Sequence, residues 1–383
     1  MSADVTPLDR DAQAAAMFDR PGATDNRRLY ADEAYFNAEI AVLADTAWCF
    51  IGTTDEWPNT NDWLRASVWG DDVFVQNVAG DLRGFRNVCQ HRGFPIRRGG
   101  SGNGPIICDF HAWRYDGEGR LVGIARNEEL FGATREDRAQ RPLAPIRIET
   151  VGSLVFAAVS DAVPPLAEYL GRYHALLAAV TARTGAMRHR WTGEAAANWK
   201  LYYEITLDDY HVAFVHPGSL GAEVRDACFL TYERSGAHSR MFARRTADWA
   251  FPGFWEAVER GEYEFAGYKI HHIFPNLFLV AGREQVLLTR LTPRALDRTR
   301  LDDWVFEVTD HPRDEAGWAD YVALQRRVSA EDQEACGAQQ EAIADFARAP
   351  VYGRLEQRLA WFHDSYETLV GARARALADG RNA

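Results

Sequence analysis

Two cysteine–histidine pairs stand close together in the first third of the chain. Cys89 and His91 form a C-x-H motif, and Cys108 and His111 form a C-x-x-H motif, with residues 92–107 between them. The 383-residue chain has only five cysteines and 11 histidines, so two such pairs in one short segment are not expected by chance. Each pair supplies one thiolate and one imidazole. The segment therefore predicts a metal centre with two sulfur and two nitrogen ligands.

Two kinds of centre use such a ligand set. Structural zinc would take all four ligands tetrahedrally, whereas a Rieske [2Fe-2S] cluster places the two thiolates on one iron and the two imidazoles on the other. Zinc fingers usually begin with C-x-x-C, because two thiolates in one tight turn chelate one ion. Here each loop mixes cysteine with histidine. The mixed loops favour the binuclear cluster, with Cys89 and Cys108 on one iron and His91 and His111 on the other.

A second group of candidate ligands lies near the middle of the chain. Asp208 and His211 are three residues apart, so on a helix they share a face. His216 would lie well around an ideal helix from His211, but the residue before Pro217 is pushed out of the helical region. We therefore expect the helix to end around Val215 and His216 to turn back toward the same pocket. The spacing predicts two imidazoles that converge on one ion.

Both segments resemble the aromatic-ring-hydroxylating, or Rieske non-heme iron, oxygenases. The first carries HRG, which begins at His91, and the run HxWxYDxxG from His111, and the second carries NWK, E and DxYHxxxxH between Asn198 and His216. The resemblance covers nearly the whole chain. It implies a Rieske [2Fe-2S] cluster and a mononuclear Fe(II) held by two histidines and one carboxylate, with open positions for O2.

The resemblance also assigns roles to individual residues. His211 and His216 are implied as iron ligands, and Asn198 is placed among the catalytic residues. Asp208 is implied to bridge His211 to a Rieske histidine of a neighbouring subunit and to carry electrons across the interface. The residue chemistry agrees, because a carboxylate orients a metal-bound imidazole by accepting its other N–H. The adjacent Asp209 could instead be a solvated helix charge.

The residues around the cluster receive a weaker assignment. By the same resemblance, Gln90, Arg92 and Trp113 support and pack against the ligands of the cluster.

The third iron ligand must come from elsewhere in the chain. The segment RRVSAEDQEACGAQQEAI resembles the late helix of the same family, with an acid pair followed by Gln339 seven residues after Asp332. We predict Asp332 as the ligand, with Glu331 as its rival. Ser329 to Asp332 can also form a capping box at a helix start, where the helix dipole favours an acid at Asp332. Both roles hold together if the ligand lies near the start of its helix.

These sites need two different frameworks, and the sequence predicts an α+β protein. We expect an N-terminal helical segment over 1–45 that packs on the catalytic domain, and an all-β Rieske module over 46–160 built from short runs rich in Val, Ile and Phe. An α+β catalytic domain over 161–383 should follow, with an antiparallel sheet covered by helices. In its strand KIHHIF, alternation sends His271 and His272 to opposite faces, one toward the core or pocket and the other toward solvent.

Composition excludes several classes of function. The chain has 43 Lys and Arg against 55 Asp and Glu, a net charge of -12, which would repel a nucleic-acid backbone. It has no uninterrupted apolar run long enough for a membrane span, and its acidic start argues against a signal peptide. The odd number of cysteines makes a disulfide framework improbable. We expect a soluble, cytoplasmic protein.

The resemblance implies a terminal oxygenase component that hydroxylates a small aromatic substrate, by adding one hydroxyl or as a cis-diol. The chain lacks a nucleotide-binding glycine fingerprint, so electrons from NAD(P)H must arrive through a separate reductase or ferredoxin. The family further implies a head-to-tail trimer, with or without a small β subunit. Alternatives are an N- or O-demethylating monooxygenase acting on a methylated or quaternary amine and, from other classes, a Rieske electron carrier or a structural zinc protein.

One aromatic segment is a candidate for substrate binding. The stretch DWAFPGFWEAV places several large rings close together, and they could line an apolar cavity or form its lid. Such rings suit an aromatic substrate by stacking or a quaternary ammonium by cation–π attraction. Core packing explains each residue alone equally well. The candidates are Trp249, Phe251, Phe254 and Trp255.

Overall fold

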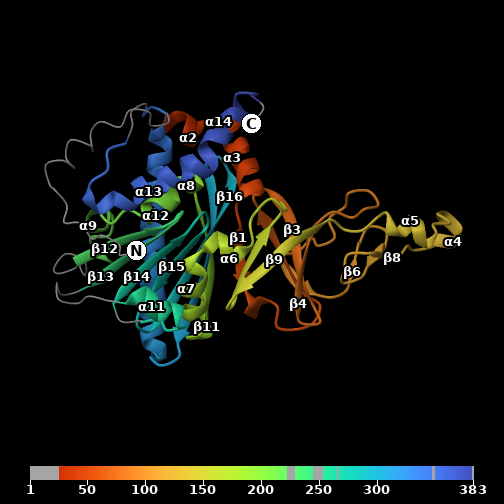
Figure 1. The fold of residues 1–383 in the computed structure, drawn as a ribbon, viewed down its shortest axis with the longest axis horizontal. Coiled ribbons are helices and arrows are strands. Elements are labelled where there is room, and N and C mark those ends of the chain that lie inside the picture. The colour runs from red at the N-terminus through yellow and green to blue at the C-terminus, as the bar shows by residue number, and fades with distance from the viewer. Residues whose placement is uncertain (1–25, 222–228, 245–252, 265–266, 347–349, 382–383) are drawn as a thin grey trace.

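The computed structural model describes residues 26–221, 229–244, 253–264, 267–346 and 350–381. Two antiparallel sheets dominate these residues (Figure 1). One sheet lies in the first half of the chain and reaches toward a narrow end formed by β6, β8, α4 and α5. The other lies in the second half and is covered by most of the helices.

The first sheet has seven strands in the order β1-β10-β9-β4-β3-β2-β5, and a three-stranded sheet β6-β7-β8 extends from it. Its hairpins are tight because two-residue turns with positive φ connect the strands: Trp69 and Gly70 between β2 and β3, and Ala79 and Gly80 between β3 and β4. The strands are β1 Cys49–Thr53, β2 Asp62–Val68, β3 Asp71–Val78, β4 Asp81–Arg86, β5 Ser101–Asn103, β6 Ile106–Ile107, β7 Arg114–Tyr115, β8 Leu121–Gly123, β9 Pro145–Val151 and β10 Leu154–Ala158.

The second sheet also has seven strands, in the order β11-β17-β16-β15-β14-β13-β12. Strands β12 to β17 follow one another as a meander, and β11 closes the edge beside β17. The apolar side chains of one face pack with α7 and α11, whereas α8 and α12 lie against the other face. The strands are β11 Thr184–Ala195, β12 Phe229–Ser235, β13 His238–Arg244, β14 Tyr268–Ile273, β15 Leu277–Ala281, β16 Gln285–Ala295 and β17 Arg298–Val308.

The helices range from a single turn to the long α12. They are α2 Asn26–Ala31, α3 Glu33–Thr46, α4 Asn127–Leu130, α5 Arg135–Ala139, α6 Leu166–Leu170, α7 Arg172–Thr181, α8 Trp199–Ile205, α9 Val212–Val215, α11 Phe254–Glu259, α12 Glu315–Ile343, α13 Gln357–Tyr366 and α14 Ala372–Ala378. Short 3-10 turns cover Thr54–Glu56 and Arg354–Glu356, and a π-helical turn covers Glu367–Gly371.

The first described helices are tied to the catalytic half by a buried polar cluster. Asp32 caps α3 by accepting hydrogen bonds from the backbone N–H groups of Ala34 and Tyr35. Two turns later, the fully buried Glu39 accepts a hydrogen bond from Lys200 Nζ of α8 at 2.6 Å. Because neither charge is exposed, each depends on the other for its solvation.

The α+β architecture predicted from the sequence is confirmed, with a sheet-rich first module and a second antiparallel sheet covered by helices. The first module is not all-β as expected, because it also contains the short helices α4 and α5. His271 and His272 do lie on opposite faces, but neither reaches solvent, so that part of the expectation is wrong. His271 Nε2 lies 2.8 Å from Tyr263 Oη, and His272 Nε2 lies 2.8 Å from Thr206 Oγ1, because helices cover both faces. Within the described residues, no helix has both the length and the apolar character that crossing a bilayer demands.

Candidate functional site

The two cysteine–histidine loops meet at the narrow end of the first module. Cys89 and Cys108 are buried, whereas His91 and His111 lie beside one another with ring centroids 4.7 Å apart and are partly exposed. Each loop is a tight turn, in which the N–H of Gly93 bonds to the Cys89 carbonyl and the Cys108 carbonyl accepts from residue 112. The thiols thus face the protein core and the imidazoles face outward.

This arrangement distinguishes between the two metals. A single zinc ion would draw all four ligand atoms to within about 4 Å of one another. Across the described chain, however, only a different group of residues brings three or more ligand atoms within 4.8 Å of each other. A two-iron cluster needs the thiolates and the imidazoles as separate pairs, and that is how these four side chains lie. The ligand set therefore fits a [2Fe-2S] cluster and not zinc.

Aromatic residues hold the loops in place. Trp113 stacks on the His91 ring at 4.7 Å, which agrees with its predicted packing role. Tyr115, from β7, lies with its hydroxyl 3.4 Å from Cys89 Sγ and accepts a hydrogen bond from the Gln90 N–H at 3.0 Å. The Gln90 side chain itself turns away to the Val88 carbonyl.

Arg92 lies near one of the loop aromatics and not at the thiols. Its guanidinium is 5.7 Å from the centroid of the Phe110 ring.

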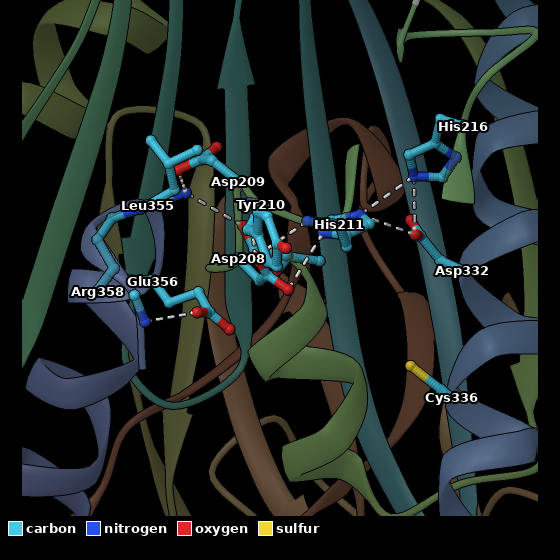
Figure 2. A network of polar contacts seen from close by, with 12 residues as sticks. Asp208, Asp209, Tyr210, His211, His216, Asp332, Cys336, Leu355, Glu356 and Arg358 are labelled. Atoms are coloured by element: carbon cyan, nitrogen blue, oxygen red, sulfur yellow. Dashed lines mark hydrogen bonds and ion pairs between the residues drawn. The ribbon is translucent and has the colours of Figure 1, made fainter. Parts of the chain in front are cut away.

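The second group of predicted ligands converges on one point. His211 Nε2 and His216 Nε2 are 3.2 Å apart, and Asp332 Oδ1 lies 3.4 Å from the first and 3.0 Å from the second (Figure 2). No other polar group in the described chain bonds to this carboxylate oxygen, and it is buried. Three unshared donor atoms aimed at one another are the arrangement that a metal ion would satisfy, and two histidines with one carboxylate suit non-heme iron.

The segment that carries Asp208 and His211 is less helical than expected. Helix α8 ends at Ile205, and only the four residues of α9 return to helix before His216. The Asp208 side chain explains the break, since it accepts hydrogen bonds from the N–H groups of Tyr210 at 2.7 Å and His211 at 3.2 Å. An acid that caps a new turn in this way competes with helix continuation. The predicted helix end near Val215 agrees with the structure, whereas the single helix through Asp208 does not.

A carboxylate contacts the outer nitrogen of each imidazole. Asp208 Oδ2 lies 3.7 Å from His211 Nδ1, and Glu331 Oε2 lies 2.7 Å from His216 Nδ1. Glu331 therefore supports a ligand and is not directed at the metal position. Burial lowers the pKa of His216, but the hydrogen bonds and charges of Asp332 and Glu331 outweigh burial and raise it.

Asp209 is not a solvated charge. Its Oδ2 accepts a hydrogen bond from Arg358 Nη2 at 2.9 Å, and its N–H donates to the Leu355 carbonyl (Figure 2). Arg358 is fully buried and also reaches His272 Nδ1 at 3.2 Å. This buried pair ties the segment after α8 to the start of α13.

Asp332 lies well inside a long helix. Helix α12 runs without interruption over 29 residues from Glu315 to Ile343, so Ser329 is not a helix cap and the predicted capping box is absent. Ser329 instead lies 3.3 Å from the hydroxyl of Tyr202 and accepts a hydrogen bond from Gln333. The helix begins earlier because Asp314 caps it by accepting from the Gly317 N–H.

A cavity of about 90 Å³ opens beside the three ligands. Its walls come from helices α8, α9 and α12 and from the second sheet, and they combine aromatic, apolar and acidic side chains. Prominent lining residues are Trp191, Tyr202, Tyr268, Phe278, Asp303 and Gln325.

Four predicted site residues are not at this cavity or cannot be placed there. Phe254 and Trp255 pack on the opposite face of the sheet, where Arg240 lies 3.7 Å from the Phe254 ring centroid. The structure therefore does not support the expected substrate role of these two residues, because α11 covers the face of the sheet that points away from the metal ligands. Trp249 and Phe251 lie outside the described residues.

Asn198 is a helix cap and not a cavity residue. Its side chain accepts a hydrogen bond from the Lys200 N–H at 3.1 Å, and its own N–H donates to Gln340 Oε1. The catalytic role that the resemblance implies for Asn198 stays a prediction.

Sequence reasoning missed Asp303 and Arg358. Both are charged residues that the structure buries, and a charge at a position that the strand or helix pattern assigns to the core was the available signal.

Family models match both halves of the chain. Residues 47–134 match the Rieske [2Fe-2S] domain, and residues 183–372 match the catalytic domain of the ring hydroxylating alpha subunit. The large oxygenase component of the 2,4-dinitrotoluene dioxygenase system of Burkholderia sp. (strain RASC) is 28% identical over 209 residues, which are 52% of this chain and 46% of that protein. The chain thus spans less than half the length of that relative.

Two further comparisons concern a different substrate and the fold. The carnitine monooxygenase oxygenase subunit of Escherichia coli (strain K12) is 29% identical over 246 residues, which are 60% of this chain and 64% of that protein. The crystal structure of naphthalene 1,2-dioxygenase from Rhodococcus sp. bound to indole superposes with a TM-score of 0.74 at 20% identity, covering 91% of this chain and 94% of the other. This structural likeness concerns the fold.

Proposed function

Since this chain belongs to the family of ring-hydroxylating oxygenase alpha subunits, we propose that it is the terminal oxygenase component of a multicomponent enzyme. It uses O2, and electrons that a separate NAD(P)H-dependent reductase or ferredoxin delivers, to oxidise a small organic substrate. The convergence of His211, His216 and Asp332 beside a cavity carries this proposal, because an electron carrier would need no second metal site.

The chain offers a complete set of ligands for both cofactors. Cys89, Cys108, His91 and His111 would hold the [2Fe-2S] cluster, and the convergent triad would hold Fe(II). When bound, these groups supply single electrons and a site where O2 is reduced. The chain's own contribution is to orient the ligands, keep the substrate beside the triad and restrict water in the cavity.

Asp208 has a position that suits the transfer of electrons between subunits. Its carboxylate faces His211 Nδ1 at 3.7 Å, and the hydrogen bond that its side chain accepts from the Tyr210 N–H places it at the start of the turn before α9. We assign to it the bridge between His211 and a Rieske histidine of a neighbouring subunit. In that role it would accept the His211 N–H and thereby also fix the ring for metal binding.

A head-to-tail trimer is an assembly that would provide such a bridge. In Figure 1 the cluster loops lie near the narrow end with β6 and β8, and α9 lies at the opposite end of the long axis. Transfer within one chain would have to cross the length of the molecule. A ring in which each cluster end contacts the next catalytic half removes that distance. A small β subunit could accompany the ring.

The substrate remains a choice between two classes. Hydroxylation of a small aromatic compound is the first candidate, and it is supported by relatives named as dinitrotoluene, naphthalene and biphenyl dioxygenases. Demethylation of a methylated or quaternary amine is the second, and it is supported by the relative named as a carnitine monooxygenase and by the buried acid Asp303 in the cavity.

Metal content and turnover test the proposal together. Protein prepared anaerobically with iron and sulfide should contain about three irons per chain, against about two for a Rieske electron carrier. With a surrogate reductase it should consume O2 and yield products whose masses show inserted oxygen or a lost methyl group. A colourless protein, or one that holds the cluster but never a third iron, would refute the assignment.

A further inference from the structure

The cavity contains a charged group that the metal site does not use. Asp303 lies on β17, only 4% exposed, on the face of the sheet that forms the cavity floor. Its Oδ1 accepts a hydrogen bond from Thr289 Oγ1 at 2.5 Å. No side chain or backbone group in the described part of the chain bonds to its other oxygen. A buried carboxylate normally has more partners than one hydroxyl.

The strand register surrounds this acid with aromatic rings. Asp303 pairs with Trp191 of β11 on one side and with Thr289 of β16 on the other, and Thr289 pairs in turn with Phe278 of β15. Directly opposed residues point to the same face of a sheet, so these four side chains form one row. Helix α8 adds Tyr202 to the same cavity.

Asp303 is the acidic residue of the cavity that has neither a partner of opposite charge nor a part in the metal site. Among the lining residues that the structure describes there is no lysine or arginine. Asp332 belongs to the metal ligands, Asp209 is paired with Arg358, and Asp208 caps the turn before α9. An anionic substrate would meet carboxylates and no cation. A cationic substrate would meet an acid with a free oxygen.

The energetics of burial point the same way. Burial raises the pKa of Asp303 to about 7, the Thr289 hydrogen bond opposes this rise, and the charge of Asp302 adds to it. The Asp303 carboxyl group is therefore only partly ionised near neutral pH when no cation lies beside it. A positive charge bound against it would favour the ionised form and recover the cost of desolvation.

We infer that Asp303, together with the rings of Tyr202, Tyr268 and Phe278, binds a positively charged nitrogen of the substrate. The substrate class is a small amine whose nitrogen is cationic and methylated, since methyl groups fit an aromatic wall and the charge fits the acid. This inference rests on the proposed oxygenase function and selects the second of its two substrate classes. We do not include Trp191 among the rings that bind the cation, because the guanidinium of Arg326 already lies 5.6 Å from its ring centroid.

Three probes of one shape and different charge test the inference. Choline, 3,3-dimethylbutan-1-ol and 3,3-dimethylbutanoate share a branched head or chain of similar size, and they are cationic, neutral and anionic. Isothermal titration of the iron-loaded, anaerobic protein should show choline binding about tenfold or more tighter than the neutral isostere, with the anion weakest. In Asp303→Asn the preference should fall to near unity.

A matched variant separates charge from general cavity damage. Gln325→Leu removes a neutral polar group from the same cavity, so it should retain the preference for the cation. Equal or tighter binding of the neutral or anionic probe by the unaltered protein would overturn the inference, as would a preference that survives in Asp303→Asn.

O2 uptake with the surrogate reductase is measured in parallel, and it distinguishes the two proposals. A preference for the cationic probe without O2 uptake on any amine would contradict the oxygenase function, but it would still support a cation-binding site at Asp303. O2 uptake on neutral arenes with no preference for the cationic probe would contradict only the cation-binding role of Asp303.

Discussion

Each imidazole of the metal site faces its own carboxylate on the side away from the metal position, and His216 is hydrogen-bonded to its carboxylate. His211 and His216 direct Nε2 toward the metal position, and their Nδ1 atoms face Asp208 and Glu331, respectively. A hydrogen bond of this kind fixes the tautomer and the orientation of the ring, so His216 is already positioned before a metal arrives, whereas His211 Nδ1 has no hydrogen-bond partner among the described residues. The two supports come from different elements, a turn and a helix, and can therefore be tested separately.

Removing a ligand should separate the two metal centres. In His211→Ala we expect the cluster loops to remain intact, because they lie in the other module, while the triad loses one of its two imidazoles. Iron content should fall from about three to about two per chain, the visible spectrum of the cluster should persist, and oxygenation should be abolished. His311→Ala, on the loop before α12, serves as the control and should keep all three properties. Turnover by His211→Ala would contradict the assignment.

Removing the support behind His216 should weaken the site without destroying it. Glu331→Gln keeps the shape of the side chain but loses the charge that His216 Nδ1 contacts at 2.7 Å. Loss of such an outer partner typically costs about 10- to 100-fold in metal affinity. Competition with a coloured iron chelator measures this change. Glu334→Gln, an exposed acid on the same helix, should leave the affinity unchanged, and an equal effect of both variants would show that Glu331 has no special role.

At the level of elements, the turn between α8 and α9 depends on a buried ion pair from a distant part of the chain. Asp209→Ala would leave the guanidinium of Arg358 buried and uncompensated. Removing one partner of a buried pair usually costs about 3–5 kcal/mol of unfolding free energy, whereas apolar replacement of both partners is often close to neutral. Urea unfolding should therefore rank Asp209→Ala below the double variant Asp209→Leu/Arg358→Met. The opposite ranking would mean that this pair does not hold the turn.

The prediction from sequence was strongest where spacing alone determines chemistry and weakest where distant segments decide local structure. The positions of Cys89, Cys108 and His211 follow from motifs within a few residues. The break before α9 follows from Asp208 bonding to the backbone and from Arg358, which lies far along the chain. Periodicity within one segment contains no information about such a partner.

The same limit explains α12 and the aromatic segment. A capping box at Ser329 is a local signal, but the helix had already begun at Asp314, and a cap is used only where a helix starts. For Phe254 and Trp255, the sequence showed large rings but not which face of the sheet α11 would cover. Side chains on the two faces of one sheet belong to different cores, and the sequence does not say which core contains the metal.

At the scale of the whole molecule, the buried polar cluster of Glu39 and Lys200 joins the N-terminal helices to the catalytic half. Beside Lys200 lies another acid, Glu204, whose pKa is far from its ordinary value. Burial raises the pKa of Glu204 to about 8 from an ordinary value of 4.5, while the Tyr30 hydroxyl, which donates to it at 2.6 Å, and Lys200 oppose the rise. The folded state thus holds a proton that the unfolded state has already lost.

Stability should consequently decrease as pH rises through this range. Below about pH 4.5 both states bind the proton, and between there and about pH 8 only the folded state does, so the unfolding free energy should fall by about 1.4 kcal/mol per pH unit, on the order of 5 kcal/mol over the whole window. Glu204→Gln cannot ionise and should show a flatter profile of stability against pH. The exposed Glu341→Gln should follow the unaltered protein. A slope that is the same in all three proteins would contradict the argument.

The proposed trimer makes a prediction about mixtures of inactive chains. Light scattering should give a mass of about 130 kDa, three times the 43.1 kDa chain. Cys89→Ser lacks the cluster and His211→Ala lacks the iron, so each is inactive alone. If electrons cross between subunits, co-assembled mixtures should regain part of the activity, because an intact cluster lies next to an intact iron site in some rings. Mixed rings without activity would show that transfer occurs within a single chain.

The length and continuity of α12 restrict how this protein can have changed during evolution. One rigid rod carries Asp332, the Glu331 support and, a turn or two earlier, Gln325 and Val328 of the cavity wall. Insertion or deletion of a single residue between them would rotate everything beyond it by about 100° and carry the ligand away from its partners. Changes of the cavity wall on α12 should therefore be tolerated as side-chain exchanges, whereas changes of chain length are expected to be tolerated only in the loops that flank the helix.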